Sequence, residues 1–332
     1  MLMVVGRSLR NCGVGGKTLL FVILTAMTLL AVECAASGHG ASAQPFEALV
    51  RVGTFNIRNQ TCDKNTPSAW DERKDDLVAL LSGMNLDAFG IQEAHPEAVA
   101  YVAEHMPNYS FVGEHRNADR KSGEATPVFW RKSRFEKERS GTFWLSETPE
   151  VPGLKGWGAA CPRVCTWVRL KDRRNGKVLC FVNTHLDHKS ALAGENGMHL
   201  ILERMKDFAV GASVVLTGDH NCFETSKAAT LATNVLKNAL YLSERPPEGP
   251  WASYGGGGFA RRCFVSCVEA MKVPACERNS KEGYRRFGGR IDYIYVSPDI
   301  QVLNYKTDAS VRPGLDLYPS DHFPIVATLK IE

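Results

Sequence analysis

The sequence lacks the features of a repetitive, disordered or strongly nucleic-acid-binding protein. After residue 43 it contains no low-complexity block, no internal repeat and no obvious linker. Its charge is nearly balanced, with 40 Lys and Arg against 36 Asp and Glu and a net charge of +4. Proteins that follow a phosphate backbone usually carry a much larger basic excess. Nucleic acid therefore stays open as a partner, but the charge does not support it.

The sequence also has no apolar run that would cross a bilayer comfortably. Its longest uncharged apolar run, residues 18–32, follows three basic residues and precedes small residues that end at Ala43. This order is typical of a secretory signal peptide. We expect residues 1–43 to be that signal peptide, and the mature chain to be exported to the periplasm or outside the cell without a stable membrane span. In the alternative, residues 18–32 remain as a membrane anchor.

Cysteines at the paired Cys-x-x-Cys spacing of a zinc site are missing. Ten cysteines occur in all, and eight remain once Cys12 and Cys34 leave with the leader. Two of them flank residues 162–164, and three crowd residues 263–276. In an exported protein this distribution favours disulfides or buried thiols over a metal site.

Hydrophobic periodicity predicts one mixed α/β domain over residues 48–332. Strand-like runs cover residues 49–57, 88–92, 127–131, 164–170, 178–185, 213–217, 291–296 and 323–331. Helix-like runs cover residues 70–84, 96–105, 196–210 and 227–236. The turn Arg174-Asn175-Gly176 is typical of a hairpin, so we expect mostly antiparallel sheets. Residues 246–289, rich in Gly, Arg and Cys, show no period and predict a long loop or insertion.

Polar residues stand at the ends of apolar strands in six places. These are Thr54-Phe55-Asn56, Gln92-Glu93, Asn183-Thr184-His185-Leu186-Asp187, Gly218-Asp219-His220-Asn221, Arg290-Ile291-Asp292 and Ser320-Asp321-His322. Any one of them can be explained as a turn former or a helix cap. All six together are hard to explain in that way. If the strands lie side by side, these residues converge on one rim.

Four of these residues are the carboxylates Glu93, Asp219, Asp292 and Asp321. Brought together they repel one another unless a cation neutralises them. Their hard oxygen atoms suit Mg²⁺, Mn²⁺ or Ca²⁺. Such a cation offsets charge on a phosphate oxygen and on a leaving oxyanion, while histidines transfer protons near neutral pH. The set predicts hydrolysis of a phosphate ester with Mg²⁺ or Mn²⁺ as cofactor.

In order and combination, the six segments resemble the signature of the endonuclease/exonuclease/phosphatase superfamily, which has the deoxyribonuclease I-like fold. Residues 141–146 and 162–167 resemble a bacterial subgroup of this superfamily whose substrate is unsettled. The resemblance extends from about Val50 to the C-terminus and omits residues 246–289. It implies an α/β four-layer sandwich, in which two mostly antiparallel β-sheets pack face to face between helices.

The resemblance also implies a set of metal and water ligands. Glu93 would be the principal metal ligand, with Asn56 and Asp321 beside it. Asp219 and Asn221 would hold the attacking water or a second metal ion.

Two acid–histidine pairs are implied in the same way. Asp292 would orient His322, and Glu124 would orient His185, each raising the pKa of its imidazole. Arg163 would contact the phosphate of the substrate.

Several positions depart from the family pattern. His220 stands where the family often has a bulky apolar residue, and we expect it to pack rather than act in the site. His188 is expected to be exposed to solvent. Residues 189–198 lack an arginine that the subgroup would supply, and residues 255–276 replace a shorter segment. The resemblance therefore indicates the chemistry but not the substrate.

Several functions remain open at this point. Within a metal-dependent phosphoric ester hydrolase, a small phosphorylated compound, a sugar phosphate or a lipid-linked phosphodiester fits the weak charge better than DNA or RNA. The alternatives are an extracellular nuclease, a sphingomyelinase-like lipid phosphodiesterase, and a non-catalytic protein that binds phosphorylated ligands. A lipid-cleaving enzyme would need exposed aromatic side chains, for which Trp251, Tyr254 and Phe259 are candidates, although we expect them to pack.

Overall fold

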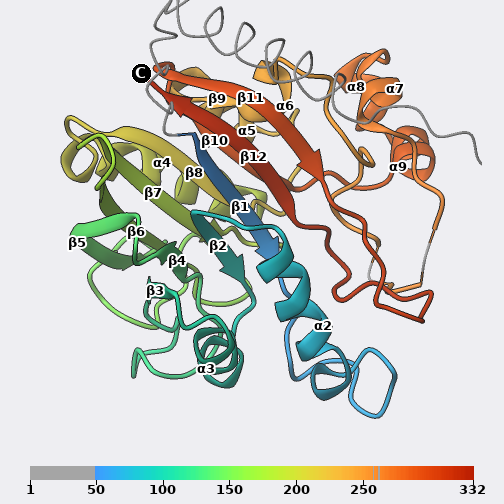
Figure 1. The fold of residues 1–332 in the computed structure, drawn as a ribbon, viewed down its shortest axis with the longest axis horizontal. Helices are drawn as coiled ribbons and strands as arrows, with labels where there is room; N and C mark the ends of the chain where they lie inside the picture. The colour runs from blue at the N-terminus through green and yellow to red at the C-terminus, as the bar shows by residue number, and fades with distance from the viewer. Residues whose placement is uncertain (1–48, 257, 261) are drawn as a thin grey trace, which may run out of the picture. The chain divides into compact units, whose positions relative to one another are not determined.

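Two six-stranded β-sheets form the centre of the domain (Figure 1). The computed structural model describes residues 49–332 except residues 257 and 261. The predicted signal peptide, residues 1–43, lies outside the described residues. Within them, no helix has the length and apolar character needed to span a membrane.

The first sheet has one parallel pair of strands at its centre. Its order is β11 (Ile300–Thr307), β12 (Ile325–Ile331), β1 (Val50–Asn56), β2 (Ala88–Gln92), β4 (Val128–Arg131) and β3 (Tyr109–Val112). Strands β1 and β2 run parallel, and the other neighbours are antiparallel.

The second sheet repeats this pattern. Its order is β5 (Phe135–Trp144), β6 (Val164–Asp172), β7 (Val178–His185), β8 (Ser213–Asp219), β10 (Asp292–Val296) and β9 (Lys237–Asn238). Only β7 and β8 run parallel. The predicted hairpin between β6 and β7 is present, and the prediction of mostly antiparallel sheets is confirmed.

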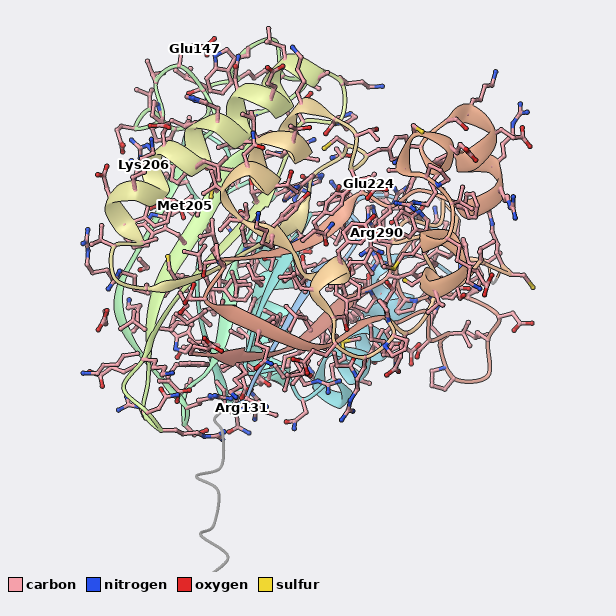
Figure 2. The ribbon with its side chains drawn as sticks, turned by 90° about the horizontal axis from the view of Figure 1, so that it is seen from above. Arg131, Glu147, Met205, Lys206, Glu224 and Arg290 are labelled. Carbon is pink, nitrogen blue, oxygen red and sulfur yellow. The ribbon has the colours of Figure 1, made fainter. Side chains whose placement is uncertain are left out.

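Helices cover the outer face of each sheet. Helices α2 (Trp70–Gly83) and α3 (Pro96–His105) pack on the first sheet, and α4 (Ala191–Phe208) and α5 (Lys227–Val235) pack on the second. On α4, Met205 is buried in this packing while Lys206 lies at the surface (Figure 2). A third cluster of apolar side chains fills the space between the sheets. The predicted four-layer sandwich is confirmed.

Strand alternation decides which side chains reach the space between the sheets. In β1, Val50 and Val52 pack between the sheets, so Asn56 at the strand end lies on the same side. In β8, Val215 packs between the sheets, and Asp219 follows it at the same parity. The polar residues predicted at the strand ends therefore line one end of the inter-sheet layer.

Two long strands were not predicted from the periodicity, β5 and β11. Both contain many polar or charged residues, and most of β5 between its buried ends is exposed or half-exposed. Each lies at the edge of its sheet. An edge strand has fewer neighbours to bury it, so its sequence need not show the apolar alternation that marks a central strand.

The segment 246–289 is more ordered than the long loop that was expected. It contains the short helices α7 (Cys267–Met271), α8 (Ala275–Arg278) and α9 (Lys281–Phe287). Trp251 and Phe287 are buried with the inter-sheet core, and Phe259 is also buried. These anchors explain the order, because burial of large apolar side chains stabilises the segment against the domain. Trp251 and Phe259 therefore pack rather than form an exposed aromatic hairpin.

The eight cysteines after residue 43 are free thiols, so of the two expected alternatives, disulfides and buried thiols, the structure shows the thiols. Cys165, Cys180 and Cys267 are buried. Burial raises the pKa of Cys180 to about 12, which keeps its thiol protonated and unreactive.

Candidate active site

A row of three site residues crosses the second sheet at its polar end. The strand register places His185 of β7 opposite Asp219 of β8, and Asp219 opposite Asp292 of β10. Adjacent strands lie about 4.8 Å apart, so this register alone brings the three side chains together. All three are buried.

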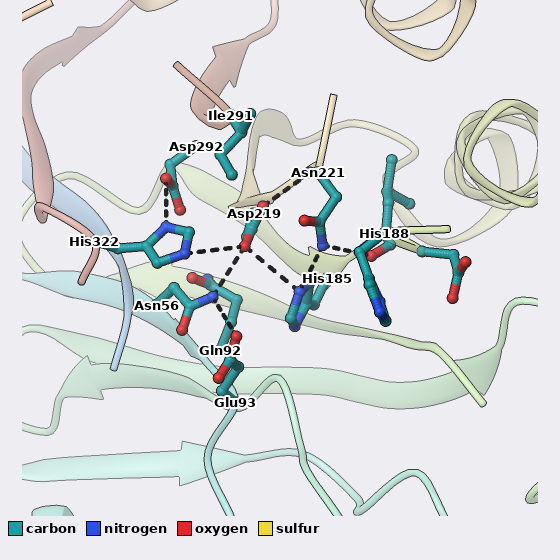
Figure 3. A network of polar contacts seen from close by, with 12 residues as sticks. Asn56, Gln92, Glu93, His185, His188, Asp219, Asn221, Ile291, Asp292 and His322 are labelled. Atoms are coloured by element: carbon teal, nitrogen blue, oxygen red, sulfur yellow. Dashed lines mark hydrogen bonds and ion pairs between the residues drawn. The ribbon is translucent and has the colours of Figure 1, made fainter. Parts of the chain in front are cut away.

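Asp219 lies between two histidines (Figure 3). Its Oδ2 atom is 3.5 Å from His185 Nε2 and 3.6 Å from His322 Nε2. On the other side of the His322 ring, Nδ1 lies 2.8 Å from Asp292 Oδ2. The predicted pair of Asp292 and His322 is thus in hydrogen-bond contact, and its catalytic role stays a prediction.

The two histidines sit in opposite electrostatic surroundings. Burial works to lower the pKa of His322, but the negative charges of Asp292 and Asp219 prevail and raise it. Burial lowers the pKa of His185 well below its ordinary value, and the charge of nearby Arg163 adds to the effect. At neutral pH these shifts favour a protonated His322 and a neutral His185.

The Asp219 carboxyl has a perturbed pKa. Burial, and after it the charge of Asp292, raise the pKa of Asp219. Asn56 opposes this by donating a hydrogen bond from Nδ2 to Asp219 Oδ2 at 2.9 Å. A second donated bond joins Asn56 Nδ2 to Glu93 Oε1 at 3.0 Å. Asn56 thereby connects the acids of the two sheets.

Glu93 follows β2 with its backbone in the left-handed region, at a φ of 61°. This conformation is uncommon for residues other than glycine and costs free energy, so its presence at a cluster of acids points to a functional constraint. The Glu93 Oε2 atom accepts a bond from the backbone N–H of Asn59 at 2.6 Å. Ligand atoms of Glu93, Asp219 and His322 all lie within 4.8 Å of one another.

Two glycines allow the close approach that the site needs. Gly218 has a φ of 148°, and a Cβ atom there would lie 2.0 Å from the carbonyl oxygen of Thr184. Gly90 faces Asn183, whose side chain would lie 2.3 Å from a Cβ at that position. The Asn183 amide fills this space and accepts a 2.7 Å bond from Gln92, which connects the two sheets directly beneath the site.

Not every predicted ligand faces the acid cluster. Asp321 Oδ2 pairs with Arg58 Nη1 at 3.0 Å and is not among the three residues whose ligand atoms converge. Asn56 presents its amide nitrogen to the acids, while its oxygen accepts a bond from the backbone N–H of Arg58. A ligand role for Asn56 would therefore require the amide to turn over.

The predicted pairing of Glu124 with His185 is wrong. Glu124 instead accepts a 2.8 Å bond from Asn59 and forms an ion pair with Arg116. An arginine binds a carboxylate more strongly than a neutral imidazole does, and His185 is held by the Asn221 amide at 2.8 Å. Glu124 and His185 still line one small cavity with Arg116.

Arg163, the residue predicted to contact the phosphate, lines that same cavity. It is buried, with Nε 3.5 Å from Asp187 Oδ2 and Nη2 2.8 Å from His188 Nδ1. Its contact with a phosphate stays a prediction. His188 is exposed, as expected.

His220 points away from the site although Asp219 and Asn221 flank it. Its ring stacks at 5.5 Å on Tyr295 and lies 5.3 Å from Tyr293, beneath the outer helices. Burial lowers the pKa of His220 to about 3. The expected packing role is what its surroundings support.

Three residues of the site were not predicted from the sequence, and a fourth, Tyr254, was named only as a candidate exposed aromatic that we expected to pack. Arg58 and Arg116 each neutralise a site acid. Ser253 donates a 2.7 Å bond to Asp292 Oδ2, and the Tyr254 ring lies 4.7 Å from the ring of His322. Arg58 lies two residues after Asn56, so its place at a strand end could have indicated that it belongs to the site. The other three come from segments without a strand-end motif.

Comparison with known proteins decides the family. The family model described as "Endonuclease/Exonuclease/phosphatase family" matches residues 53–322. The chain belongs to this family. Members of the superfamily hydrolyse phosphoester bonds and generally depend on a divalent metal ion, and this member carries a candidate acidic site for one. No curated protein matched the chain.

Solved structures of the endonuclease/exonuclease/phosphatase superfamily agree with this assignment. A family member from Bacteroides vulgatus is 31% identical, with a TM-score of 0.71, over 86% of this chain and 99% of that chain. A mannosyl-6-phosphatase from Bacteroides thetaiotaomicron is 28% identical, with a TM-score of 0.71, over 84% of this chain and 99% of that chain. The catalytic domain of human Nocturnin, 17% identical with a TM-score of 0.61 over 86% and 94%, shares the fold.

Proposed function

We propose that this protein is a divalent-cation-dependent hydrolase of phosphate monoesters. The convergence of ligand atoms from Glu93, Asp219 and His322 within 4.8 Å carries the proposal. The weak net charge and the similarity to a mannosyl-6-phosphatase favour a small phosphorylated substrate over a nucleic acid.

The residues fit a hard divalent cation. Asp219 and Asp292 are both buried at 1% exposure, and Asp292 Oδ1 has no hydrogen-bond partner among the described residues. Buried carboxylate charge of this kind needs a neutralising partner. Glu93 and Asp219 would hold Mg²⁺ or Mn²⁺ through carboxylate oxygens. Asp321, which pairs with Arg58, would join them only if that ion pair opened. The bound cation supplies charge neutralisation at the phosphate and at the leaving oxygen.

The protein's own groups supply proton transfer and orientation. Asp219, with Asn221 beside it, would hold the attacking water and accept its proton. Protonated His322, oriented by Asp292, donates from Nε2 toward the phosphate. Asn221 and neutral His185 fix the other side of the phosphate, and Arg163 adds a positive charge there.

The experiment is a substrate and metal screen on the purified mature protein. We expect hydrolysis of p-nitrophenyl phosphate and mannose 6-phosphate, and little hydrolysis of bis-p-nitrophenyl phosphate, plasmid DNA or sphingomyelin. EDTA should abolish the activity, and Mg²⁺ or Mn²⁺ should restore it better than Zn²⁺ does. Full activity after exhaustive chelation contradicts cation dependence, and diester cleavage without monoester cleavage contradicts the substrate class.

We also infer that the protein acts after export, from the arrangement of basic, apolar and small residues before Gln44. Sequencing the N-terminus of the cell-derived protein tests this. A mature chain that begins near Gln44 agrees with export, and a chain that retains residues 18–32 in the membrane fraction supports the anchor instead.

A further inference from the structure

Three aromatic side chains form a continuous strip beside the candidate site. We name Phe223, Tyr254 and Tyr284 the aromatic rim. The Tyr254 ring lies 4.7 Å from the ring of His322, and the rings of Phe223 and Tyr284 lie 5.9 Å apart. Gly289 joins the two halves, because a Cβ there would lie 3.1 Å from the Tyr284 ring and 3.4 Å from the Tyr254 ring.

The backbone fixes the rim against the catalytic residues. Tyr254 forms isolated bridges with both Gly289 and His322. At the other end, Phe223 comes two residues after Asn221, whose amide contacts His185. In Figure 3, His322 and Asn221 lie on either side of Asp219. The rim therefore runs from His322 toward the segment that carries Asn221.

Packing does not account for this strip. Trp251 and Phe259 of the same segment are buried, whereas Tyr284 is 39% exposed and Phe223 and Tyr254 are half-buried. Among the described residues, neither the Tyr254 hydroxyl nor the Tyr284 hydroxyl has a hydrogen-bond partner. Exposed aromatic faces with free hydroxyls suit a ligand that has a flat or puckered ring and polar edges.

We propose that the aromatic rim binds the ring of the substrate's leaving group, so that the enzyme prefers ring-bearing phosphate monoesters. This rests on the proposed function, which sets the phosphate against Asp219 and His322. The leaving alcohol must then lie beside the residues that border the site. Among these, the aromatic rim can stack against a ring. A pyranose of a sugar phosphate and a base of a nucleotide share this chemistry.

The test measures a selectivity ratio: kcat/KM for a ring-bearing ester divided by kcat/KM for the ringless ester glycerol 3-phosphate. Mannose 6-phosphate and adenosine 5′-monophosphate serve as the two ring-bearing substrates. We expect Tyr284→Leu and Phe223→Leu each to lower the ratio about 3- to 10-fold, mainly through KM, as expected for the loss of an aromatic stacking contact. A fall with only one of the two substrates identifies the source of the ring.

Two controls separate ring loss from general damage. Tyr284→Phe keeps the ring and removes only the hydroxyl, so the ratio should fall less than it does in Tyr284→Leu. Phe111→Leu removes a ring that is 41% exposed on β3, in the other sheet, and should change nothing. Gly289→Ala places a Cβ atom 3.1 Å from the Tyr284 ring, which must shift to accommodate it, and should lower the ratio without removing either ring.

The outcomes are distinguishable. One outcome refutes the role of the rim alone: the wild type cleaves glycerol 3-phosphate, and both Leu variants keep the wild-type ratio and melting temperature. In that case the rim does not bind the leaving group, and the proposed function stands. If the Leu variants fail to fold, an unchanged ratio in folded Gly289→Ala overturns the inference equally. If the wild type cleaves no phosphate ester, the proposed function fails and this inference with it.

Discussion

His220 provides a quantitative test of how the strand end is organised. Its ring is 1% exposed, lies against Tyr293 and Tyr295, and both of its nitrogens lack hydrogen-bond partners among the described residues. Replacing it with phenylalanine keeps an aromatic ring between the tyrosines and removes the titratable group. The change leaves Asp219 and Asn221, on either side, untouched.

The expected magnitude follows from the pKa. Burial lowers the pKa of folded His220 to about 3, from an ordinary value of 6.5. The unfolded chain binds a proton below pH 6.5 and the folded chain does not, so folding loses stability as the pH falls from 6.5 toward 3. At pH 5 the loss from this residue is about 2 kcal/mol, since each pKa unit corresponds to about 1.36 kcal/mol. Above pH 6.5 the contribution is constant.

The assay is urea denaturation at pH 7.5 and pH 5 for the wild type and His220→Phe. Other groups titrate alike in both proteins, so the difference between their pH dependences isolates His220. We expect the wild type to lose about 2 kcal/mol more than the variant on acidification. His199→Phe, at an exposed position on α4, is the matched control and should behave like the wild type.

Two results would refute this reasoning. An equal loss of stability in the wild type and His220→Phe means that the ring reaches solvent or a partner when protonated. A fall in kcat of a hundredfold or more in a stable His220→Phe, about what general acid–base groups contribute, means that His220 acts in the reaction.

Three further predictions concern the reaction. His322→Ala should lower kcat about 10²–10⁴-fold with little change in KM. Adding Asp292→Ala should lower kcat scarcely further, because the orienting acid then has no histidine to orient. Additive losses of kcat in steady-state kinetics would contradict the pair. Glu93→Ala should shift the Mg²⁺ concentration for half-maximal activity upward, so that excess Mg²⁺ restores part of the rate; an unchanged midpoint in the titration places the cation elsewhere. Ser253→Ala should lower kcat about tenfold and reduce the free energy of unfolding by about 1–3 kcal/mol, because Ser253 also accepts bonds from the backbone N–H groups of Ile291 and Asp292. Normal kcat with reduced stability would make Ser253 a purely structural residue.

The sequence by itself determined the central strands and what their ends carry. A strand buried on both faces forms a nearly continuous apolar run whose side chains alternate between the two faces, so β2 and β7 begin and end where predicted. The same alternation determines on which side of its strand Asp219 lies and on which side His220 lies. It places Asn56 and Asp219 on the inter-sheet side of their strands, whereas the contact between them depends on how the two sheets pack face to face.

Tertiary structure decided the partners of the charged side chains. Arginine side chains are long and flexible, and no local period predicts which acid they reach. Arg116 pairs with Glu124, which was expected to pair with His185, and Arg58 pairs with Asp321, which was expected to bind the metal. Ion pairs between residues 263 positions apart in sequence depend on the folded chain path alone.

Tertiary structure also decided the role of the segment 246–289. Its sequence shows no period because its order comes from single anchors, such as Trp251, that fit into a core already formed by other elements. From that position Ser253 reaches Asp292 and Tyr254 reaches His322. Strand periodicity indicated the chemistry of the site. It did not indicate the groups that support and border the site, because these belong to segments whose conformation depends on long-range contacts.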